Sequence, residues 1–323
     1  MQLVLLSKPI EKEEEIEKEV DVIIIGGGAA GYSAALYSAR YGLKTLVITR
    51  DVGGLMNEAS IVEDYPAIYS IKGSELGLRF KEHAEMFGAK TLIDEVVDIK
   101  TENESFLVIT AGKQEIKSKV IIFATGSKRR KLGVPGENLN GVSYCAECDA
   151  LFFKDKIVGV VGGGNSAFHD ALVLAQHAKK VYIIHRRDEF RADAILINSA
   201  KQNPKIEILT NKVVKEIRGN KKVEEVVLED VKTKETINLK LDGLFVAIGL
   251  DPNSELAKKI GVQTNERGEI IVDEGMRTNI KGVFAAGDVT NACEGFKQIV
   301  TAAAQGSIAA YNAFKYIKYG IWK

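Results

Sequence analysis

Two of the three cysteines in this chain lie three positions apart, within the stretch SYCAECDALFF at 143–153. The spacing of Cys145 and Cys148 suits a metal-binding pair, a short structural disulfide or a redox-active pair. Zinc normally takes four ligands, yet the sequence has no second C-x-x-C and no histidines at ligand spacing. A disulfide that closes so short a loop adds little stability. In a cysteine-poor chain, beside a strand–helix–strand unit, the spacing favours a redox pair.

An acid follows the second cysteine directly. Asp149 could protonate a departing thiolate or accept its proton, which is the role of a general acid–base group. Aspartate is also common in turns for reasons unrelated to catalysis. The sequence leaves both interpretations open.

A glycine-rich turn near the start of the chain has the context of a nucleotide site. The stretch VDVIIIGGGAAGYSAALYSARYGLKTLVIT (20–49) predicts a buried strand, a turn, a helix and a second strand. The turn matches G-x-G-x-x-G at Gly26, Gly28 and Gly31. In this context the glycines allow a pyrophosphate to approach the helix amino terminus. The acid expected after the second strand is absent, since Thr49 occupies that region and Asp51 lies slightly beyond.

The same unit recurs about 136 residues later, at 156–185. Its turn has glycine at 162 and 164 and alanine at the last place, Ala167, which the fingerprint allows. The second strand ends in a basic stretch that contains His185, Arg186, Arg187 and Arg191. Such a stretch can be a solvated surface cluster, but at this point of the motif arginines select the 2′-phosphate of NADP(H).

A nicotinamide and a disulfide need an intermediary, because the nicotinamide donates hydride and the disulfide takes up electrons at sulfur. A flavin does both. The first glycine loop is therefore predicted to bind FAD and the second to bind NADPH.

The order of the motifs predicts an α/β protein with two Rossmann-like, three-layer ββα nucleotide-binding domains, the NADPH domain inserted into the FAD domain. Residues 1–19 form a charged extension. The FAD domain is discontinuous, at 20–127 and 250–323, and the NADPH domain, at 128–249, carries the cysteines. The nicotinamide and the cysteine pair both belong to the inserted domain, and each must reach the same flavin. We therefore expect a rigid-body rotation about linkers near Lys128–Leu132 and Ile248–Pro252.

Composition narrows the functional class. The chain has 323 residues, a formal net charge of zero and 46% hydrophobic residues, an ordinary globular mixture. No basic surplus points to nucleic acid, and no apolar run approaches the length needed to cross a bilayer. We expect a cytoplasmic protein without a bound metal.

Seven motifs between Val20 and Tyr316 together resemble the low-molecular-weight thioredoxin reductases, a branch of the pyridine nucleotide–disulfide oxidoreductases. They are GGGAAGYSAALYSAR, FATGS, YCAECDA, VVGGGNSA, IHRRDEFRA, LFVAIGLDPN and GVFAAGDV. The resemblance implies FAD, NADPH, a homodimer and the reduction of thioredoxin. It also implies that Cys148 faces the flavin and that Cys145 attacks the disulfide of thioredoxin.

The resemblance assigns residues to each cofactor. For FAD these are Gly26, Gly28, Ala29, Ala30, Gly31, Thr49, Gly53, Gly54, Asp64, Ala124, Thr125, Gly126, Gly287, Asp288, Lys297, Gln298 and Ile299. For NADPH they are Gly162, Gly164, Asn165, Ser166, His185, Arg186, Arg187, Arg191, Ile248 and Gly249.

The sequence departs from the family pattern at several of its motifs, with an expected effect on flavin potential and nicotinamide affinity. The departures are Leu55, Asp64, Ala150, His169, Asp170 and the run Lys297–Ile299. Ala150 replaces a glycine and is expected to restrict the backbone turn after the cysteine pair.

Other functions fit part of the pattern. A flavoprotein reductase could serve ferredoxin, a peroxiredoxin system, a glutaredoxin-like protein or oxygen. A non-catalytic redox sensor could use the cysteines as a switch. A metal-binding or purely structural pair is the remaining alternative.

Overall fold

The computed structural model describes residues 17–59, 61–292 and 296–322. Most of the predicted charged extension, and Cys293, lie outside these residues. The chain divides into two compact units. Of the described residues, the first unit holds 17–58, 73–126, 252–292 and 296–322, and the second holds 59, 61–72 and 127–251.

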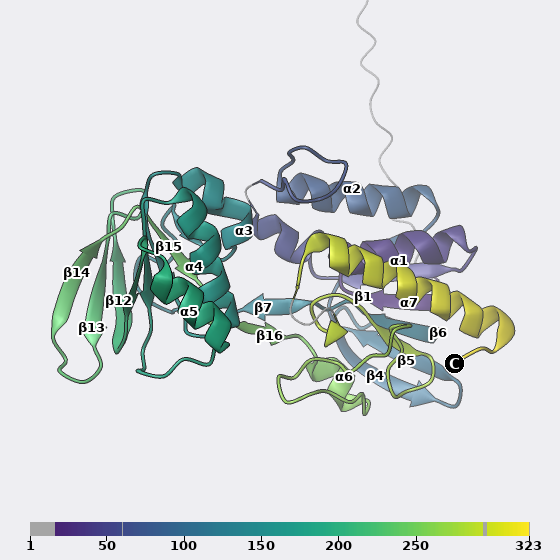
Figure 1. Cartoon of the computed structure of the whole chain (residues 1–323). Coiled ribbons are helices and arrows are strands. Elements are labelled where there is room, and N and C mark those ends of the chain that lie inside the picture. The colour runs from purple at the N-terminus through teal and green to yellow at the C-terminus, as the bar shows by residue number, and fades with distance from the viewer. Residues whose placement is uncertain (1–16, 60, 293–295, 323) are drawn as a thin grey trace, which may run out of the picture. The chain divides into compact units, whose positions relative to one another are not determined.

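The first unit is built on a sheet with the strand order β3-β2-β1-β6-β5-β4, in which β17 also pairs with β6 (Figure 1). Its parallel strands are β1 (Glu19–Ile25), β2 (Thr45–Thr49), β3 (Lys90–Ile93), β6 (Glu115–Phe123) and β17 (Val283–Ala285). An antiparallel meander adds β4 (Val96–Glu102) and β5 (Ser105–Thr110). Its helices are α1 (Ala29–Arg40), η1 (Gly54–Glu58), α2 (Gly73–Met86), α6 (Glu255–Lys259) and α7 (Ile299–Tyr319).

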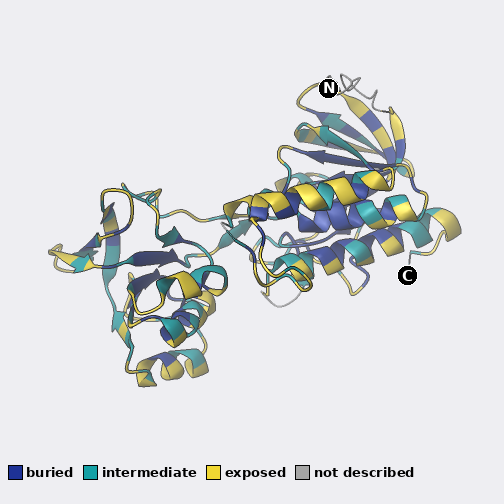
Figure 2. Cartoon of the chain, turned by 90° about the horizontal axis from the view of Figure 1, so that it is seen from above, coloured by how far each residue is buried: buried dark blue, intermediate teal, exposed yellow. Residues whose placement is uncertain are grey.

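Alternation along β1 creates three layers. Val22 and Ile24 pack with alanines of α1 and α7 on one face of the sheet. Ile23 and Ile25 pack on the other face with residues of the meander and of the segment near α6. A strand that is buried on both faces is apolar throughout, which is why VIII reads as a continuous hydrophobic run. Figure 2 shows these strands buried, while the helices carry a buried and an exposed side.

The second unit repeats this plan. Its five-stranded parallel sheet has the order β11-β10-β9-β15-β8. These strands are β8 (Val142–Ser143), β9 (Ile157–Val161), β10 (Lys180–Ile184), β11 (Ile206–Leu209) and β15 (Gly243–Val246). The meander is β12 (Lys212–Arg218), β13 (Glu225–Asp230) and β14 (Thr236–Lys240). The helices are α3 (Ala146–Asp149), η2 (Ala150–Phe153), α4 (Asn165–His177) and α5 (Ala194–Gln202).

A two-stranded ribbon, β7 (Ser127–Arg129) with β16 (Leu250–Pro252), lies where the chain passes between the units. Arg130 donates two hydrogen bonds to Asp251 Oδ1, at 2.8 and 2.6 Å, and its backbone N–H donates to Gly249 O at 3.1 Å. These bonds tie the two connecting strands to each other.

The predicted fold class, α/β with two Rossmann-like three-layer units, one inserted into the other, is confirmed by this topology. The predicted domain limits differ from the two compact units mainly at residues 59–72, which belong to the second unit. Which cofactor each unit binds stays a prediction.

Candidate active site

The first glycine loop connects β1 to α1 by backbone contacts that only glycine permits. Gly26 has a φ of +112°, and a Cβ on it would lie 2.2 Å from Ala124 O. A Cβ on Gly31 would lie 1.9 Å from Gly26 O. A side chain at either position would separate the helix from the end of the sheet.

Several other residues predicted to bind FAD meet at this carboxyl edge of the sheet. Gly53 N donates to Gly27 O at 2.8 Å. A Cβ on Gly54 would lie 3.6 Å from Gly28 Cα, and one on Gly287 would lie 2.9 Å from Ala30 Cβ. Ala29 and Ala30 are the first residues of α1.

Two of the predicted side chains are bonded within the protein. Thr49 Oγ1 donates to Asp51 O at 2.6 Å. Thr125 Oγ1 donates to Asn253 O at 2.7 Å, while Asn253 Nδ2 donates to Thr125 O at 2.9 Å. Gly126 follows, and its O accepts from Asn253 N at 3.0 Å. The bonds to Asn253 therefore fix the segment Ala124–Gly126.

The turn that carries Asp288 is held by side chains from two directions. Gln305 on α7 accepts from Gly287 N at 2.7 Å. Lys297 Nζ donates to Asp288 O at 2.9 Å and to Glu269 Oε1 at 2.7 Å. The ion pair is largely buried, with side-chain exposures of 13% for Lys297 and 12% for Glu269. Burial would raise the pKa of Glu269, but the bonds from Lys297 and Asn265 lower it overall.

The remaining predicted FAD residues divide into two groups. Gln298 caps α7 and Ile299 begins it, so both follow Lys297 directly. Asp64 is exposed and lies in the segment 59–72, which groups with the second unit. Its role in binding FAD stays a prediction.

The start of α1 fits a phosphate group. Its N-cap is Gly28, which provides no side-chain cap, so the first backbone N–H groups of the helix have no partner from that residue. The nearest atom to a Cβ on Gly28 would be 4.0 Å away, so the space beside the turn is open. Uncapped N–H groups at a positive helix end are the donors that a pyrophosphate requires.

The second glycine loop has the same construction. A Cβ on Gly162 would lie 2.4 Å from Ala247 O, whereas nothing lies within 4 Å of one on Gly164. Gly164 is the N-cap of α4 and supplies no side-chain cap. Asn165 and Ser166 begin the helix and are exposed.

The basic stretch after β10 lies against this loop. A Cβ on Gly163 would lie 2.2 Å from the His185 ring. Arg186, Arg187 and Arg191 are exposed, and their guanidinium groups make no ion pair with any residue that the structure describes. Burial lowers the pKa of His185, and the charges of Arg186 and Arg187 lower it further. Ile248 and Gly249 follow β15 at the same edge.

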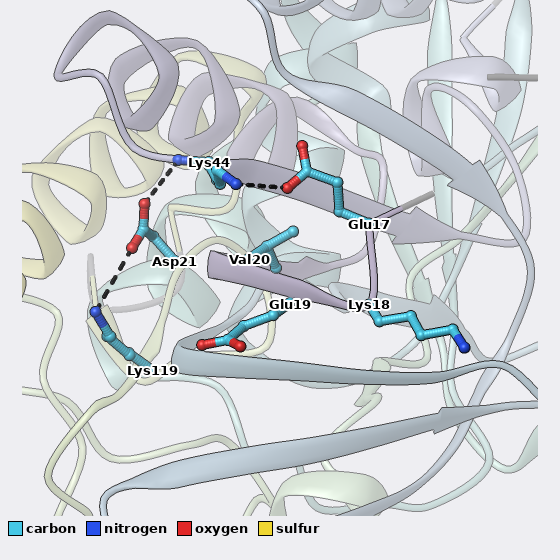
Figure 3. Close-up of a pocket in the computed structure, with 7 residues that line it drawn as sticks. All are labelled: Glu17, Lys18, Glu19, Val20, Asp21, Lys44 and Lys119. Carbon is cyan, nitrogen blue, oxygen red and sulfur yellow. Dashed lines mark hydrogen bonds and ion pairs between the residues drawn. The ribbon is translucent and has the colours of Figure 1, made fainter. Parts of the chain in front are cut away.

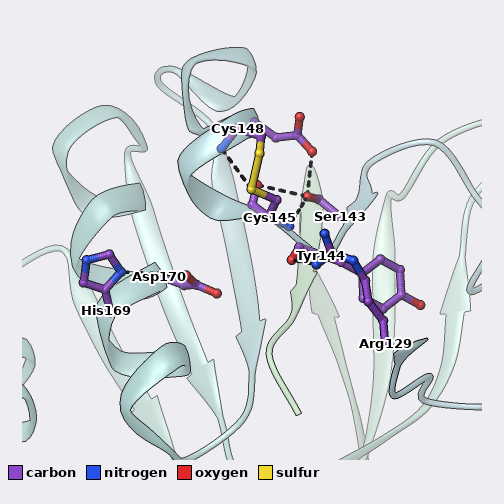
Figure 4. The surroundings of a disulfide bond; sticks show 8 residues. Arg129, Ser143, Tyr144, Cys145, Cys148, His169 and Asp170 are labelled. Atoms are coloured by element: carbon purple, nitrogen blue, oxygen red, sulfur yellow. Dashed lines mark hydrogen bonds and ion pairs between the residues drawn. A yellow bond between two sulfur atoms is a disulfide. The ribbon is translucent and has the colours of Figure 1, made fainter. Parts of the chain in front are cut away.

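Cys145 and Cys148 form a disulfide at the start of α3, with a Cα–Cα distance of 5.4 Å (Figure 4). Cys145 is the N-cap of this short helix, and its Sγ accepts a hydrogen bond from Cys148 N at 3.3 Å. Both residues are partly exposed. The pair is therefore accessible, and one of its sulfurs receives a backbone hydrogen bond.

Asp149 is bonded to the residue that precedes the pair by two positions. Ser143 Oγ donates to Asp149 Oδ2 at 2.6 Å and accepts from Cys145 N at 3.1 Å. Asp149 N donates to Cys145 O at 3.2 Å. Ser143 thus links the backbone of the first cysteine to the candidate acid, a contact that the sequence prediction missed.

A cluster of charged residues lies beside α3. His169 Nε2 lies 4.0 Å from Glu147 Oε1, and His169 Nδ1 lies 4.0 Å from Asp170 Oδ1. Burial and the negative charge of Glu147 raise the pKa of Asp170 to about 7, although Arg129 opposes the shift. His169 and Asp170, both labelled in Figure 4, lie on α4, which packs against α3.

The residues after Asp149 gave one wrong expectation and one missed feature. Ala150 has φ −55° and ψ −36°, ordinary helical backbone, so it does not restrict the turn as expected. Leu151 and Phe152 in η2 are 60% and 54% exposed. An apolar run directly after a redox pair, on a short helix, was the signal that could have identified them.

The pocket drawn in Figure 3 is not part of this site. It has a volume of about 470 Å³ and is lined mainly by charged residues at the amino end of β1, together with Lys44 and Lys119. Ligands of open α/β sheets bind beyond the carboxyl ends of the strands, which is the opposite edge.

The structure also shows, for the residues it describes, no group of three or more potential metal ligands and no helix able to span a membrane.

Comparison with known proteins decides the family. The sequence profile of the pyridine nucleotide-disulphide oxidoreductases matches residues 20–306. The chain belongs to this family. Its flavin and pyridine nucleotide chemistry agrees with the two glycine loops and the disulfide described above.

Within the pyridine nucleotide-disulphide oxidoreductases, the chain is similar to proteins named thioredoxin reductase, which confirms the resemblance found in the sequence. It is 44% identical to the one from Bacillus subtilis over 307 residues, covering 94% of this chain and 96% of that protein. It is 43% identical to the one from Listeria innocua, covering 94% and 95%.

Two solved thioredoxin reductases share the fold over almost the whole chain. The structure from Streptococcus pyogenes is 40% identical, with a TM-score of 0.86 and coverage of 94% of this chain and 99% of that one. The structure from Lactococcus lactis, described as the FR conformation, is 42% identical, with a TM-score of 0.66 and coverage of 92% and 99%.

Proposed function

We propose that this protein is a thioredoxin-disulfide reductase that uses NADPH and FAD. The observation that carries the proposal is the accessible Cys145–Cys148 disulfide with the Ser143-bonded Asp149 beside it. The same chain carries two uncapped glycine loops of the kind that bind nucleotides. The relatives named thioredoxin reductase support the same assignment.

FAD is the proposed ligand of the first unit. Its pyrophosphate would lie at the start of α1, against Gly28, Ala29 and Ala30, where the space is open. Asp288 and the start of α7 would hold the remainder of the molecule, since Lys297 and Gln305 fix the turn between them. When bound, FAD accepts hydride from a nicotinamide and passes the electron pair to a disulfide.

NADPH is the proposed donor, bound at the second loop. The exposed Arg186, Arg187 and Arg191 have no acidic partner among the described residues, so they are available to a 2′-phosphate. An acid in their place would repel that group. This basic stretch supports NADPH over NADH.

The two cysteines are assigned different roles. After reduction, the Cys148 N–H would stabilise a thiolate on Cys145, because it already donates to that sulfur. Cys145 therefore attacks the disulfide of thioredoxin and forms a mixed disulfide. Cys148 then attacks the sulfur of Cys145, which re-forms the Cys145–Cys148 bond and displaces the second thiolate of thioredoxin. Asp149 supplies a proton to the departing thiolate of thioredoxin. The cycle leaves Cys145–Cys148 oxidised and thioredoxin as a dithiol.

Leu151 and Phe152 are the proposed contacts with thioredoxin. They follow the reacting cysteines by a few residues, and their side chains are more than half exposed. An exposed apolar pair beside a reactive group marks a site of transient protein contact.

The inserted unit carries both the cysteines and the NADPH loop, and each must reach one flavin. We propose that the two connections near β7 and β16 allow it to reorient between the two reactions.

A second copy of the chain is the proposed partner of α7. Val300, Ala304, Ile308 and Tyr311 form an exposed apolar stripe on one side of this helix. A stripe of this kind is typical of a homodimer interface, and sedimentation of the purified protein tests it.

We place the enzyme in the cytoplasm, where a cycling dithiol is regenerated.

The proposal is tested by following NADPH oxidation with oxidised thioredoxin as the acceptor. Wild type should turn over, and Cys145→Ser/Cys148→Ser should not. Oxygen as acceptor distinguishes the alternative of an NADPH oxidase, since that activity would survive the double substitution. Turnover with ferredoxin or a glutaredoxin-like protein but not with thioredoxin would overturn the assignment of the acceptor.

A further inference from the structure

Asn165 and Asp193 form a reciprocal pair of hydrogen bonds across the second nucleotide loop. Asn165 Nδ2 donates to Asp193 Oδ2 at 2.9 Å, and Asp193 N donates to Asn165 Oδ1 at 2.8 Å. Asn165 is the first residue of α4, directly after Gly164. Asp193 lies 28 residues further on, directly before α5.

Asp193 occupies a position where aspartate usually has a different partner. It is the N-cap of α5, and an N-cap aspartate normally accepts a hydrogen bond from a backbone N–H of its own helix. Asp193 makes no such side-chain bond. Its carboxylate bonds to Asn165 instead, so the capping bond is replaced by one that connects two segments.

The Asn165–Asp193 bond holds one end of the basic stretch, His185–Arg191, against the glycine loop. Arg191 N donates to Gly163 O at 2.8 Å, two residues before Asp193. At the other end, the His185 ring lies close over Gly163, and His185 Nε2 lies 3.0 Å from Glu189 O. The segment from His185 to Asp193 thus contacts the glycine loop at both ends: His185 lies against Gly163, and the Arg191–Asp193 end bonds to Gly163 and Asn165.

The three arginines of this segment depend on that attachment for their place. Their side chains are exposed and, among the described residues, without hydrogen-bond or ion-pair partners. Only the backbone of the segment fixes where they project. A bidentate arginine–phosphate contact requires a defined position relative to the nucleotide.

We propose that Asp193, through its bond to Asn165, is a positioning residue that sets the preference for the 2′-phosphate of the coenzyme. The inference rests on the proposed use of NADPH. Asp193 does not touch the phosphate; it holds the arginine segment against the loop from which the nucleotide is bound.

The sign of the effect separates positioning from simple electrostatics. Asp193 carries a negative charge beside an anion site. Simple electrostatics therefore predicts that removing Asp193 strengthens phosphate binding, because a Coulomb repulsion is lost. If Asp193 positions the arginines, removing it weakens binding of the 2′-phosphate. The two explanations therefore predict opposite changes.

The test compares two nucleotides that differ only in the 2′-phosphate. Binding of adenosine 2′,5′-bisphosphate and of adenosine 5′-monophosphate to the oxidised, flavin-loaded protein is measured by calorimetry. Wild type should prefer the bisphosphate. Asp193→Ala and Asn165→Asp should lower that preference roughly three- to tenfold, because each breaks the pair.

Two further variants make the result specific. Asn165→Asp/Asp193→Asn should restore the preference that Asn165→Asp loses, since an amide at 193 can donate to a carboxylate at 165, which still accepts from the backbone N–H of residue 193. Glu189→Ala is the charge control, because its exposed side chain makes no hydrogen bond to a described residue. It should leave the preference unchanged or slightly raised.

The outcomes separate the inference from the function on which it rests. If wild type does not prefer the bisphosphate, the NADPH assignment is wrong and the inference fails with it. If wild type prefers it and Asp193→Ala keeps or strengthens that preference, NADPH stands and the inference is overturned. Should Asp193→Ala bind neither nucleotide, the exchanged variant decides: a restored preference supports positioning, and a lost one contradicts it.

Discussion

Ser143 Oγ donates a hydrogen bond of 2.6 Å to Asp149 Oδ2 and so fixes the acid that follows the redox-active pair. The same hydroxyl accepts from the backbone N–H of Cys145 at 3.1 Å. Because of this arrangement, the orientation of Asp149 relative to the two sulfurs depends on a side chain outside the C-x-x-C-D motif.

Ser143→Ala should slow the reduction of thioredoxin without slowing the reduction of the flavin. Loss of a hydrogen bond to a charged group lowers the rate of proton transfer by about tenfold. Stopped-flow absorbance separates the two steps. Ser199→Ala is the control, since Ser199 Oγ donates to Ile195 O within α5 of the same unit and, among the described residues, to no other group. A proportional decrease in both steps would contradict a role for Ser143 in orienting Asp149.

Phe152→Ala and Leu151→Ala should raise KM for thioredoxin and leave the reduction of a small aromatic disulfide unchanged. An exposed apolar side chain that becomes buried on docking contributes about 1–3 kcal/mol. Steady-state kinetics with both substrates measures the effect. Ile195→Ala removes a comparably exposed apolar residue of α5 and should change neither. An unchanged KM for thioredoxin would place the docking surface elsewhere.

Asp170→Asn should stabilise the protein increasingly as the pH rises. The pKa of Asp170 is raised to about 7 in the folded protein, from a usual value near 3.8. The folded state therefore binds more protons between about pH 4 and pH 7, and wild type loses stability across that window. An asparagine avoids this loss, by an amount on the order of a few kcal/mol at pH 8.

Thermal unfolding of wild type and Asp170→Asn between pH 4.5 and pH 8.5 tests this assignment. The difference in melting temperature should grow up to about pH 7 and then level off. Glu147→Gln should reduce the pH dependence of wild type, because the charge of Glu147 contributes to the shift. A difference that is constant with pH would show that Asp170 ionises normally.

Lys297→Met should destabilise the first unit and weaken its hold on the flavin. The substitution leaves Glu269 buried without its ion-pair partner and removes the bond to Asp288 O. Breaking one side of a buried pair costs about 3–5 kcal/mol. Lys318→Met, at an exposed position of α7, is the control. Flavin release on heating, followed by fluorescence, should begin at a lower temperature only in Lys297→Met.

Gly28→Ala and Gly31→Ala should fail in different ways. A Cβ on Gly31 would collide with Gly26 O at 1.9 Å, so this variant should fold poorly. A Cβ on Gly28 meets nothing closer than 4.0 Å, so this variant should fold and yet bind FAD weakly, because the methyl group occupies the approach of the phosphate. Circular dichroism together with flavin content distinguishes the two. Normal flavin content in Gly28→Ala would contradict the proposed phosphate site.

The sequence predicted those features that depend on local pattern. Both glycine loops could be identified because a tight strand–helix turn needs glycine at fixed spacing, as at Gly26 and Gly31. The β-branched runs predicted parallel strands buried on both faces, and β1 and β9 have this character. The accessible disulfide followed from the spacing of its cysteines.

Features that depend on contacts between distant residues could not be predicted. The bond between Asn165 and Asp193 joins residues of two helices, and the Lys297–Glu269 pair joins residues 28 positions apart. The concern about Ala150 was wrong because that position takes helical backbone, for which alanine is well suited.

Passage of electrons through Cys145–Cys148 is tested by an anaerobic titration of the flavin-loaded protein with NADPH, followed by oxidised thioredoxin. Wild type should take up about two equivalents of NADPH, one for the flavin and one for the disulfide, and thioredoxin should then restore the flavin spectrum. Cys145→Ser/Cys148→Ser should take up about one equivalent and stay reduced when thioredoxin is added. Restoration of the oxidised flavin spectrum by thioredoxin in the double variant would show that electrons reach thioredoxin without these cysteines.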